Sequence, residues 1–150
     1  MSTQRIVRQI EISVLIHATE DREKVIKAVS NLFPSNLEFP NYVESNLDGY
    51  FGDPITSLYF LIKNRKPANE LFNHLISNLS SLDYVMLMNE LPQRMDETKN
   101  LYLRFDKQKA YLRKISLERH DSIRLKISLN IPHKADPEEV LKSYLEEIRI

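Results

Sequence analysis

The chain of 150 residues is 42% hydrophobic, and its 21 Lys and Arg residues balance its 21 Asp and Glu residues. This length and composition predict one domain over residues 1–150 with a single core, and the absence of cysteine excludes disulfides, thiolate metal sites and a cysteine nucleophile. The apolar runs are far shorter than the roughly 18 residues that span a bilayer, and the N-terminus lacks a signal-peptide pattern, so a cytoplasmic protein without a membrane partner is expected.

The first predicted element is a strand. Isoleucine and valine alternate with more polar residues between positions 10 and 17, and this period of two predicts a strand over 6–17 with one strongly buried face. Thr19 is the expected N-cap of a following helix, with Glu20 and Asp21 in its first turn, where carboxylates favour the helix dipole. Pro34 is expected to end this helix.

The middle of the chain is expected to contain two strands around a turn, and then two helices. Both glycines of the chain, Gly49 and Gly52, lie in the predicted turn, which indicates backbone with positive φ. Pro67 fits the first position of one helix, and Pro92 is expected to end the next. The expected elements are strands at 42–47 and 55–63, the turn at 48–54, and helices at 67–79 and 82–91.

The last third of the chain returns to strands. A turn at 96–100 leads into a predicted strand at 101–105, and residues 122–131 alternate more regularly than any other segment. Asp136 is the expected N-cap of a C-terminal helix. The order β-α-β-β-α-α-β-β-α predicts a single α+β domain in which helices pack on one face of a largely antiparallel sheet.

Charge is sorted along this chain. Residues 99–126 contain nine Lys or Arg residues and three acids, a net charge of +6. Because side chains alternate along a strand, Tyr102 and Arg104 point away from the core that their neighbours enter. If strands 101–105 and 122–131 share a sheet, one open face is expected to carry Tyr102, Arg104, Arg124 and Lys126, with Lys107, Lys109, Arg113 and Lys114 at its edge.

A cationic face with interleaved rings, Tyr102 and Tyr111 among them, is typical of proteins that bind single-stranded or looped RNA, because cations bind phosphates and rings stack on unstacked bases. Two other interpretations stay open. Cations on exposed strands also protect sheet edges against aggregation, and a basic, aromatic face could bind an acidic protein partner, as an adaptor does. The turn at Gly49, Tyr50, Phe51 and Gly52 is interpreted as a plain turn, or alternatively as a stacking platform.

No motif for catalysis is recognised in the sequence. The acidic pairs Glu20/Asp21 and Glu138/Glu139 lie at predicted helix N-termini, where the helix dipole explains them. The four histidines lack the paired spacing of a metal site, and no phosphate-binding loop is present. We therefore expect no enzyme activity, no metal and no cofactor.

Four stretches of the chain together resemble one family. They are IHATEDREKVIKAV, GYFGDPI, LYLRFDKQKAYL and DSIRLKISL, and they follow the order seen in the archaeal RNA-binding proteins known as predicted exosome subunits. The matching positions are Thr19, Glu20, Asp21, Gly49, Gly52, Pro54, Ile55, Arg104, Asp106, Lys107 and Gln108.

That resemblance implies a fold similar to the large-subunit ribosomal protein of the L-five type. It also implies RNA binding in RNA processing or degradation, exosome- or ribosome-related partners, and no catalytic residues. It adds Gln108 to the RNA-binding candidates. The sequence itself leaves the oligomeric state open, a homodimer included. The chain departs from the family pattern at two places, with Asp53 in place of Asn and Arg113 in place of Gly. We expect Asp106 to be a turn cap or a local partner of a cation, since a carboxylate would repel phosphate.

Overall fold

The computed structural model describes residues 5–48 and 54–149. Within these ranges the chain forms five strands and six helices. The predicted turn residues Gly49, Tyr50, Phe51 and Gly52 lie outside the described residues. The elements are β1 (Val7–Ile16), α1 (Arg22–Ser30), β2 (Tyr42–Asp48), β3 (Pro54–Ile62), α2 (Arg65–Ser77), α3 (Ser81–Asn89), α4 (Leu91–Arg94), β4 (Asn100–Asp106), α5 (Lys107–Tyr111), β5 (Ser122–Leu129) and α6 (Pro137–Arg149).

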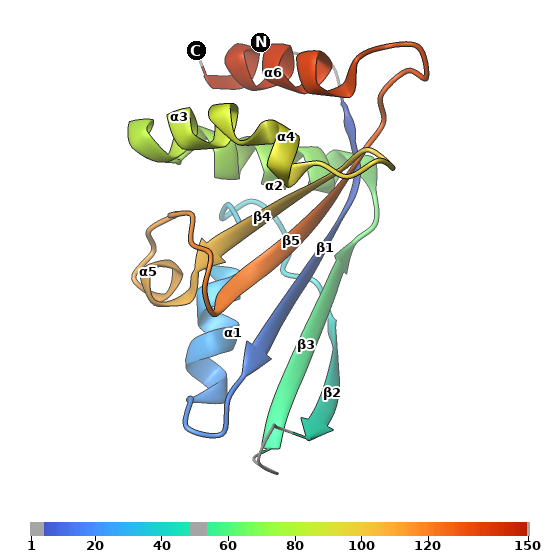
Figure 1. Ribbon diagram of the computed structural model, residues 1–150. Helices are drawn as coiled ribbons and strands as arrows, with labels where there is room; N and C mark the ends of the chain where they lie inside the picture. Colours follow the sequence, from blue (N-terminus) through green and yellow to red (C-terminus); the bar gives the residue numbers. More distant parts are fainter. Residues whose placement is uncertain (1–4, 49–53, 150) are drawn as a thin grey trace.

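The five strands form one sheet in the order β2-β3-β1-β5-β4 (Figure 1). Every neighbouring pair is antiparallel, as the alternating strands predict. The helices α2, α3, α4 and α6 gather at one end of the sheet, whereas α1 and α5 lie together nearer the other end. Among the described residues, no helix is both long enough and apolar enough to cross a membrane.

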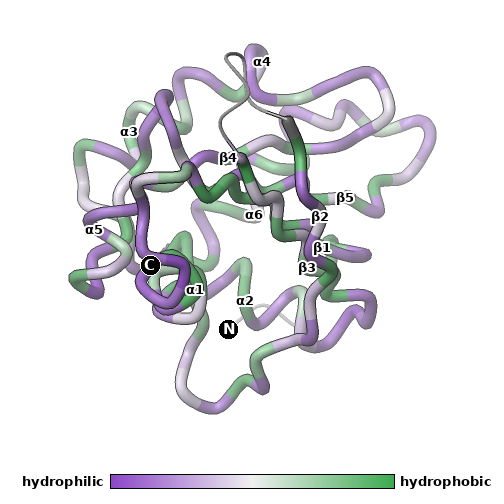
Figure 2. The backbone as a smooth tube through the Cα atoms, turned by 90° about the horizontal axis from the view of Figure 1, so that it is seen from below, coloured by the Kyte–Doolittle hydropathy of each residue, from purple (hydrophilic) through white to green (hydrophobic). Residues whose placement is uncertain are grey.

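The core lies between one face of the sheet and the helices. Isoleucine, leucine and phenylalanine residues of β1, β3, β4 and β5 are fully buried on this face, among them Ile12, Phe60 and Leu103. Both α1 and α2 lie on the same side of the strands (Figure 2), and α6 packs on the outside of α2, where Tyr144 stacks on Phe72 at 6.1 Å between ring centroids. Among the residues that the structure describes, no such helical layer covers the other face of the sheet, which we call the open face.

Several predicted helix ends are wrong by a few residues. Asp21, and not Thr19, is the N-cap of α1, because its carboxylate accepts a hydrogen bond from the Glu23 amide at 2.9 Å. The helix α2 begins at Arg65, so Pro67 is its third residue. Pro92 does not end the third helix. That helix ends at Asn89, and Pro92 lies in the first turn of the separate helix α4, where the backbone amide that proline lacks needs no partner.

Helix α5 was not predicted from the sequence. Asp106 caps it by accepting a hydrogen bond from the Lys109 amide at 2.9 Å, so the expectation of a cap at Asp106 is confirmed. Two backbone hydrogen bonds end the helix. The Arg113 amide donates to the Ala110 carbonyl oxygen at 2.9 Å, and the Lys114 amide donates to the Lys109 carbonyl oxygen at 2.8 Å. This pattern is a Schellman motif, and it requires a left-handed residue, here Arg113 with φ of 65°.

The conformation of Arg113 explains why glycine suits this position. A residue with a β-carbon loses free energy in the left-handed region, and glycine does not. We expect Arg113→Gly to raise the free energy of unfolding by up to about 1 kcal/mol, because the relieved strain exceeds the added freedom of the unfolded chain. Urea denaturation would measure the change. Arg113→Ala is the control, since it keeps the β-carbon and should match the parent; equal stability of all three proteins would contradict the prediction.

Candidate nucleic-acid interface

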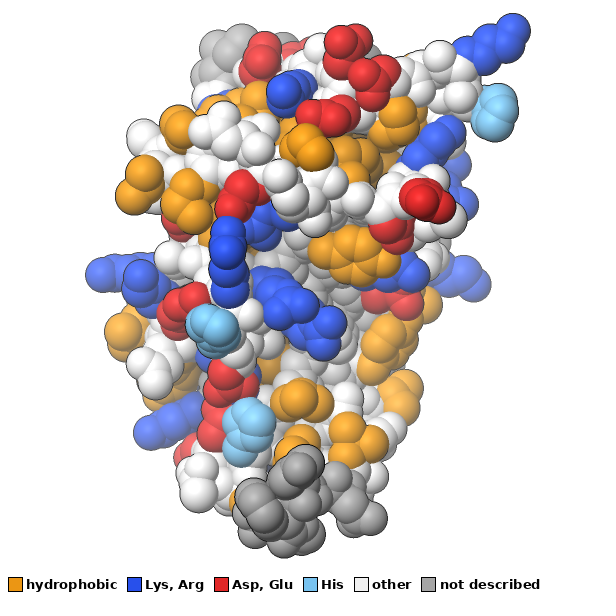
Figure 3. Space-filling view, in the orientation of Figure 1, with side chains coloured by type: hydrophobic (Ala, Val, Ile, Leu, Met, Phe, Trp, Pro, Cys, Tyr) orange, Lys and Arg blue, Asp and Glu red, His pale blue; other side chains and the backbone are white. Residues whose placement is uncertain are grey.

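The open face brings together four of the residues selected from the sequence. In the register of β4 and β5, Arg104 lies directly opposite Arg124, and Tyr102 lies opposite Lys126. Tyr102, Arg104 and Arg124 are exposed, and Lys126 is half-buried. The prediction that both strands share a sheet and present these side chains on its less covered face is confirmed. Figure 3 shows Lys and Arg side chains gathered near the middle of the molecule in this view.

The arrangement of Arg104 and Arg124 is electrostatically unfavourable. Like charges directly opposite each other on neighbouring strands destabilise a sheet. Within the described residues neither guanidinium forms an ion pair, and Arg104 donates one hydrogen bond, from Nη1 to the Arg119 carbonyl oxygen at 3.1 Å. An anion that binds between the two guanidinium groups would remove this repulsion. The pair is therefore the strongest candidate site for a phosphate on this face.

Other cations near the open face already have acidic partners. Glu90 accepts hydrogen bonds from both Arg94 and Arg119, and these bonds, the one from Arg94 foremost, hold the pKa of Glu90 below its usual value. Lys126 Nζ lies 3.8 Å from Glu11 Oε2, a looser pair. The positive charge that remains available on this face is thus concentrated on the arginine pair and, in part, on Lys126.

Two tyrosines of the open face have their hydroxyl groups fixed by carboxylates. The Tyr102 hydroxyl donates to Asp96 Oδ2 at 2.8 Å, and this bond raises the pKa of Tyr102. The Tyr59 hydroxyl donates to Glu11 Oε1 at 2.7 Å, which, with a smaller effect of burial, raises the pKa of Tyr59 to about 12. Each ring is thus held in place through its hydroxyl group, and the negative charge beside it is that of its carboxylate partner.

The open face is hollowed around Arg104. One depression of about 320 Å³ is shared by Tyr59, Tyr102 and the arginine pair. A second, of about 280 Å³, continues past Arg124 to Leu15, and a third, of about 570 Å³, continues past Tyr102 to α4. Because Arg104 lines all three, a ligand that lies along the face passes this residue.

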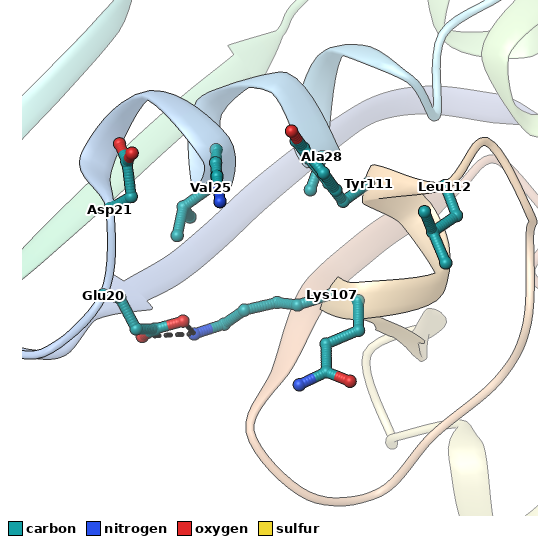
Figure 4. Close-up of a pocket in the computed structure, with 9 residues that line it drawn as sticks. Glu20, Asp21, Val25, Ala28, Lys107, Tyr111 and Leu112 are labelled. Carbon is teal, nitrogen blue, oxygen red and sulfur yellow. Dashed lines mark hydrogen bonds and ion pairs between the residues drawn. The ribbon is translucent and has the colours of Figure 1, made fainter.

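Lys107 does not lie at the edge of the open face, and that expectation is wrong. Its side chain is buried, with 7% of the residue exposed, and it extends toward the end of β1 (Figure 4). Its ammonium group donates to the Leu15 carbonyl oxygen at 2.7 Å and to Glu20 Oε1 at 3.0 Å, and lies 3.0 Å from Asp121 Oδ1. The first turn of α5 rotates this side chain inward, where the two carboxylates compensate its charge.

The same cluster contains the ligand types of a metal site. His17, Glu20 and Asp121 approach one another, and His17 Nε2 lies 2.9 Å from Asp121 Oδ1. Partial burial opposes the charge of Asp121, yet the hydrogen bonds from His17 and Lys107 outweigh it and lower the pKa of Asp121. The Lys107 ammonium already occupies the position between both carboxylates that a metal cation would take. The geometry therefore favours an ion-pair network that fastens α5 to the sheet.

The remaining sequence candidates lie on the helical side of the molecule instead of at the edge of the open face. The Asn31 side chain of α1 donates to the carbonyl oxygens of Ala110 and Tyr111, which holds α5 against α1. Lys24 lies 5.9 Å from the centre of the Tyr111 ring, and Gln108 lines the small hollow between the two helices. A separate depression near the ends of α1 and α2 is lined by Lys109, Arg113 and Lys114. The ten candidates therefore do not form one surface.

Glu11, Ser13 and Tyr59 complete the open face and were not predicted from the sequence. Ser13 pairs with both Arg124 and Tyr59 across β1, so these three side chains lie in one row. Alternation along β1 and β3 contained this signal. The signal is weak because Leu15, Tyr59 and Leu61 make the outward positions nearly as apolar as the buried ones.

Comparison with known proteins gives consistent matches over most of the chain. The model of a family described as RNA binding matches residues 9–129. The RNA-binding protein PAB1135 of Pyrococcus abyssi is 37% identical over 143 residues, covering 91% of this chain and 90% of that protein. The DUF54 protein AF2318 of Archaeoglobus fulgidus superimposes with a TM-score of 0.78 at 30% identity, covering 95% of this chain and 99% of that one. Mth689 of Methanothermobacter thermautotrophicus, also a DUF54 protein, gives 0.75 at 31% identity, covering 97% and 99%.

Proposed function

We propose, since this chain belongs to the RNA-binding family, that it binds single-stranded or looped RNA on its open face and does not catalyse a reaction on it. The observation that carries the proposal is the Arg104–Arg124 pair, two exposed arginines directly opposite each other in the register of β4 and β5, with no acidic partner among the described residues. A bridging phosphate would accept hydrogen bonds from both groups and would offset their repulsion.

A single-stranded or looped RNA suits this face better than a regular duplex. The face is a broad sheet with exposed rings at Tyr59 and Tyr102, and within residues 5–48 and 54–149 no helix projects from it that could enter a groove of a duplex. Sequence-tolerant binding of this kind combines phosphate contacts with stacking of unpaired bases on aromatic side chains. Lys126 lies opposite Tyr102 and is the third cation that the bound RNA strand could contact.

A salt titration tests the proposal. A fluorescein-labelled 15-nucleotide oligouridylate is titrated with the protein between 50 and 200 mM salt, and binding is followed by anisotropy. Three phosphate contacts predict a log–log slope near −2, which is a loss of about 20-fold in affinity over this range. The oligonucleotide should be recovered intact after prolonged incubation. An absence of binding at 50 mM salt would contradict the proposal. So would a ribonuclease activity that copurifies with the protein.

The arginine pair would also attract an acidic protein segment, which is the adaptor alternative. The two candidates separate in a competition experiment with a polyglutamate peptide of the same net charge as the oligonucleotide. RNA binding predicts that the peptide displaces the oligonucleotide poorly, because it has no bases to stack on the rings. Equal displacement at equal charge would favour the adaptor.

The resemblance to predicted exosome subunits supports two narrower parts of the proposal. The first is a role in RNA processing or degradation in association with an exosome, which co-purification of exosome subunits with the tagged chain from archaeal cells would test. The second is the relation to the ribosomal protein of the L-five type. Superposition of the two sheets, strand by strand, would test it, because the order β2-β3-β1-β5-β4 must then be shared.

A further inference from the structure

The open face has two halves of different chemistry. The cationic half is Tyr102, Arg104, Arg124 and Lys126 on β4 and β5. The apolar half is formed on β1, β2 and β3 by side chains that are exposed although they are hydrophobic, namely Leu15, Val43, Leu47, Tyr59 and Leu61. Tyr59, Val43 and Leu61 are direct neighbours in the strand register, and exposed apolar side chains that gather on one surface often mark a binding site. The ring of Tyr59 has been named above as a stacking surface, but the aliphatic side chains beside it are not explained by ring stacking or by phosphate contacts.

Strand register joins the two halves side by side. One row across the sheet consists of Arg104, Arg124, Ser13, Tyr59 and Val43 in that order. The strands β5 and β3 are separated only by β1, so Arg124 and Tyr59 are about 10 Å apart across the sheet. Ser13, between them, is small, and the same depression of about 320 Å³ is lined by all three residues. A ligand in this depression would contact both the Arg124 side chain and the Tyr59 ring.

The Tyr59 ring is held in position before any ligand binds. Its hydroxyl is bonded to Glu11, and Glu11 in turn lies near Lys126, so the ring is fixed at one edge while 37% of the residue stays exposed. A side chain ordered in advance loses little conformational entropy on binding. The neighbouring side chain of Val43, 63% exposed, extends the apolar surface beyond the ring.

We propose that the apolar half of the open face is a base-stacking platform centred on Tyr59, on which an unpaired base lies while the Arg104–Arg124 pair holds its phosphate. This inference rests on the proposed function and assigns the position of its base subsite. The charge of the adjacent half selects the occupant, because a ligand with an anionic backbone and flat apolar faces fits both halves at once. A second copy of this chain would bring another arginine pair against the first.

The experiment compares two 15-nucleotide ligands, oligouridylate and an abasic oligonucleotide of the same length and charge. The parent protein should bind oligouridylate about tenfold more tightly, because stacking is absent in the abasic strand. Tyr59→Leu should remove most of this difference and leave affinity for the abasic strand and the salt slope unchanged. Tyr59→Phe should keep the preference, since it keeps the ring. Tyr111→Leu, on the helical side, is the matched control and should behave as the parent.

Each other result overturns the platform in a recognisable way. If the parent binds both ligands equally, or if Tyr59→Leu still prefers oligouridylate as strongly as the parent does, bases do not stack on Tyr59. The proposed phosphate binding is not contradicted by that result. If neither ligand binds, the proposed function itself fails. If light scattering finds a dimer that Tyr59→Leu dissociates, a second copy covers the apolar half. Circular dichroism and urea denaturation of each variant ensure that only folded proteins are compared. If Tyr59→Leu fails to fold, Tyr59→Thr replaces it, because threonine also lacks the ring and is favoured in strands.

Discussion

Replacement of Arg104 and Arg124 together by Gln is expected to lower the affinity for oligouridylate about 25-fold at 0.1 M salt. Each phosphate contact on a single strand releases about 0.7 counterions, so two lost contacts flatten the log–log salt slope by about 1.4. The remaining slope, near −0.7, would come from Lys126. Anisotropy titrations of parent and variant over the same salt range measure both quantities.

The matched control for this variant is Lys27→Gln with Lys66→Gln. These two exposed lysines lie on α1 and α2, which cover the opposite face of the sheet, and the double change alters net charge equally. Its salt slope should match that of the parent. The arginine variant should also be at least as stable as the parent, because a repulsive cross-strand pair is removed. Identical slopes for parent and arginine variant would mean that these cations protect the sheet and do not bind RNA.

Lys107→Met is expected to lower the free energy of unfolding by about 2–3 kcal/mol. The substitution leaves Glu20, Asp121 and the Leu15 carbonyl without the ammonium group that they share. Loss of one partner of a fully buried pair costs about 3–5 kcal/mol, and the estimate is smaller here because both carboxylates are partly exposed. Urea denaturation at neutral pH measures the difference.

Lys109→Met is the control for Lys107→Met, because it removes an exposed lysine from the same helix and should change stability by less than about 0.5 kcal/mol. Below its unfolding temperature, the Lys107 variant should keep the parent's RNA affinity. A Lys107 variant with parental stability and weakened RNA binding would show that this side chain leaves its pocket to contact RNA.

Strand alternation predicted which side chains of β4 and β5 share the open face. Tyr102, Arg104, Arg124 and Lys126 have buried isoleucine, leucine or phenylalanine neighbours on both sides, so the faces were unambiguous. In β3 the outward residues Tyr59 and Leu61 are themselves hydrophobic. The residue types alone therefore could not show whether this side of β3 is exposed to ligands or buried under another layer. The order of the strands in the sheet could not be predicted from local sequence patterns either, because it depends on which distant strands pair with β1.

Helix α5 and the burial of Lys107 could not be predicted in the same way. Five residues are too few to show a helical period, and the element depends on the Asp106 cap and on the left-handed Arg113. A lysine is rarely buried without acidic partners. The partners of Lys107 are Glu20, 87 residues before it in the sequence, and Asp121, 14 residues after it, so their proximity cannot be read from the local sequence. The stretches around TED and RFDKQ that carry the family resemblance thus meet through the Lys107–Glu20 ion pair.

The central position of β1 has a consequence for synthesis of the protein. β1 pairs on one side with β3, within the first half of the chain, and on the other with β5, which ends at Leu129. Contacts between segments so distant in sequence form slowly. On the ribosome, the growing chain therefore keeps one edge of β1 unpaired until about the last fifth emerges, and this edge is open to wrong pairing and aggregation. Both arginines of the proposed phosphate site lie on the late strands β4 and β5, so the proposed RNA-binding surface is complete only when the sheet closes.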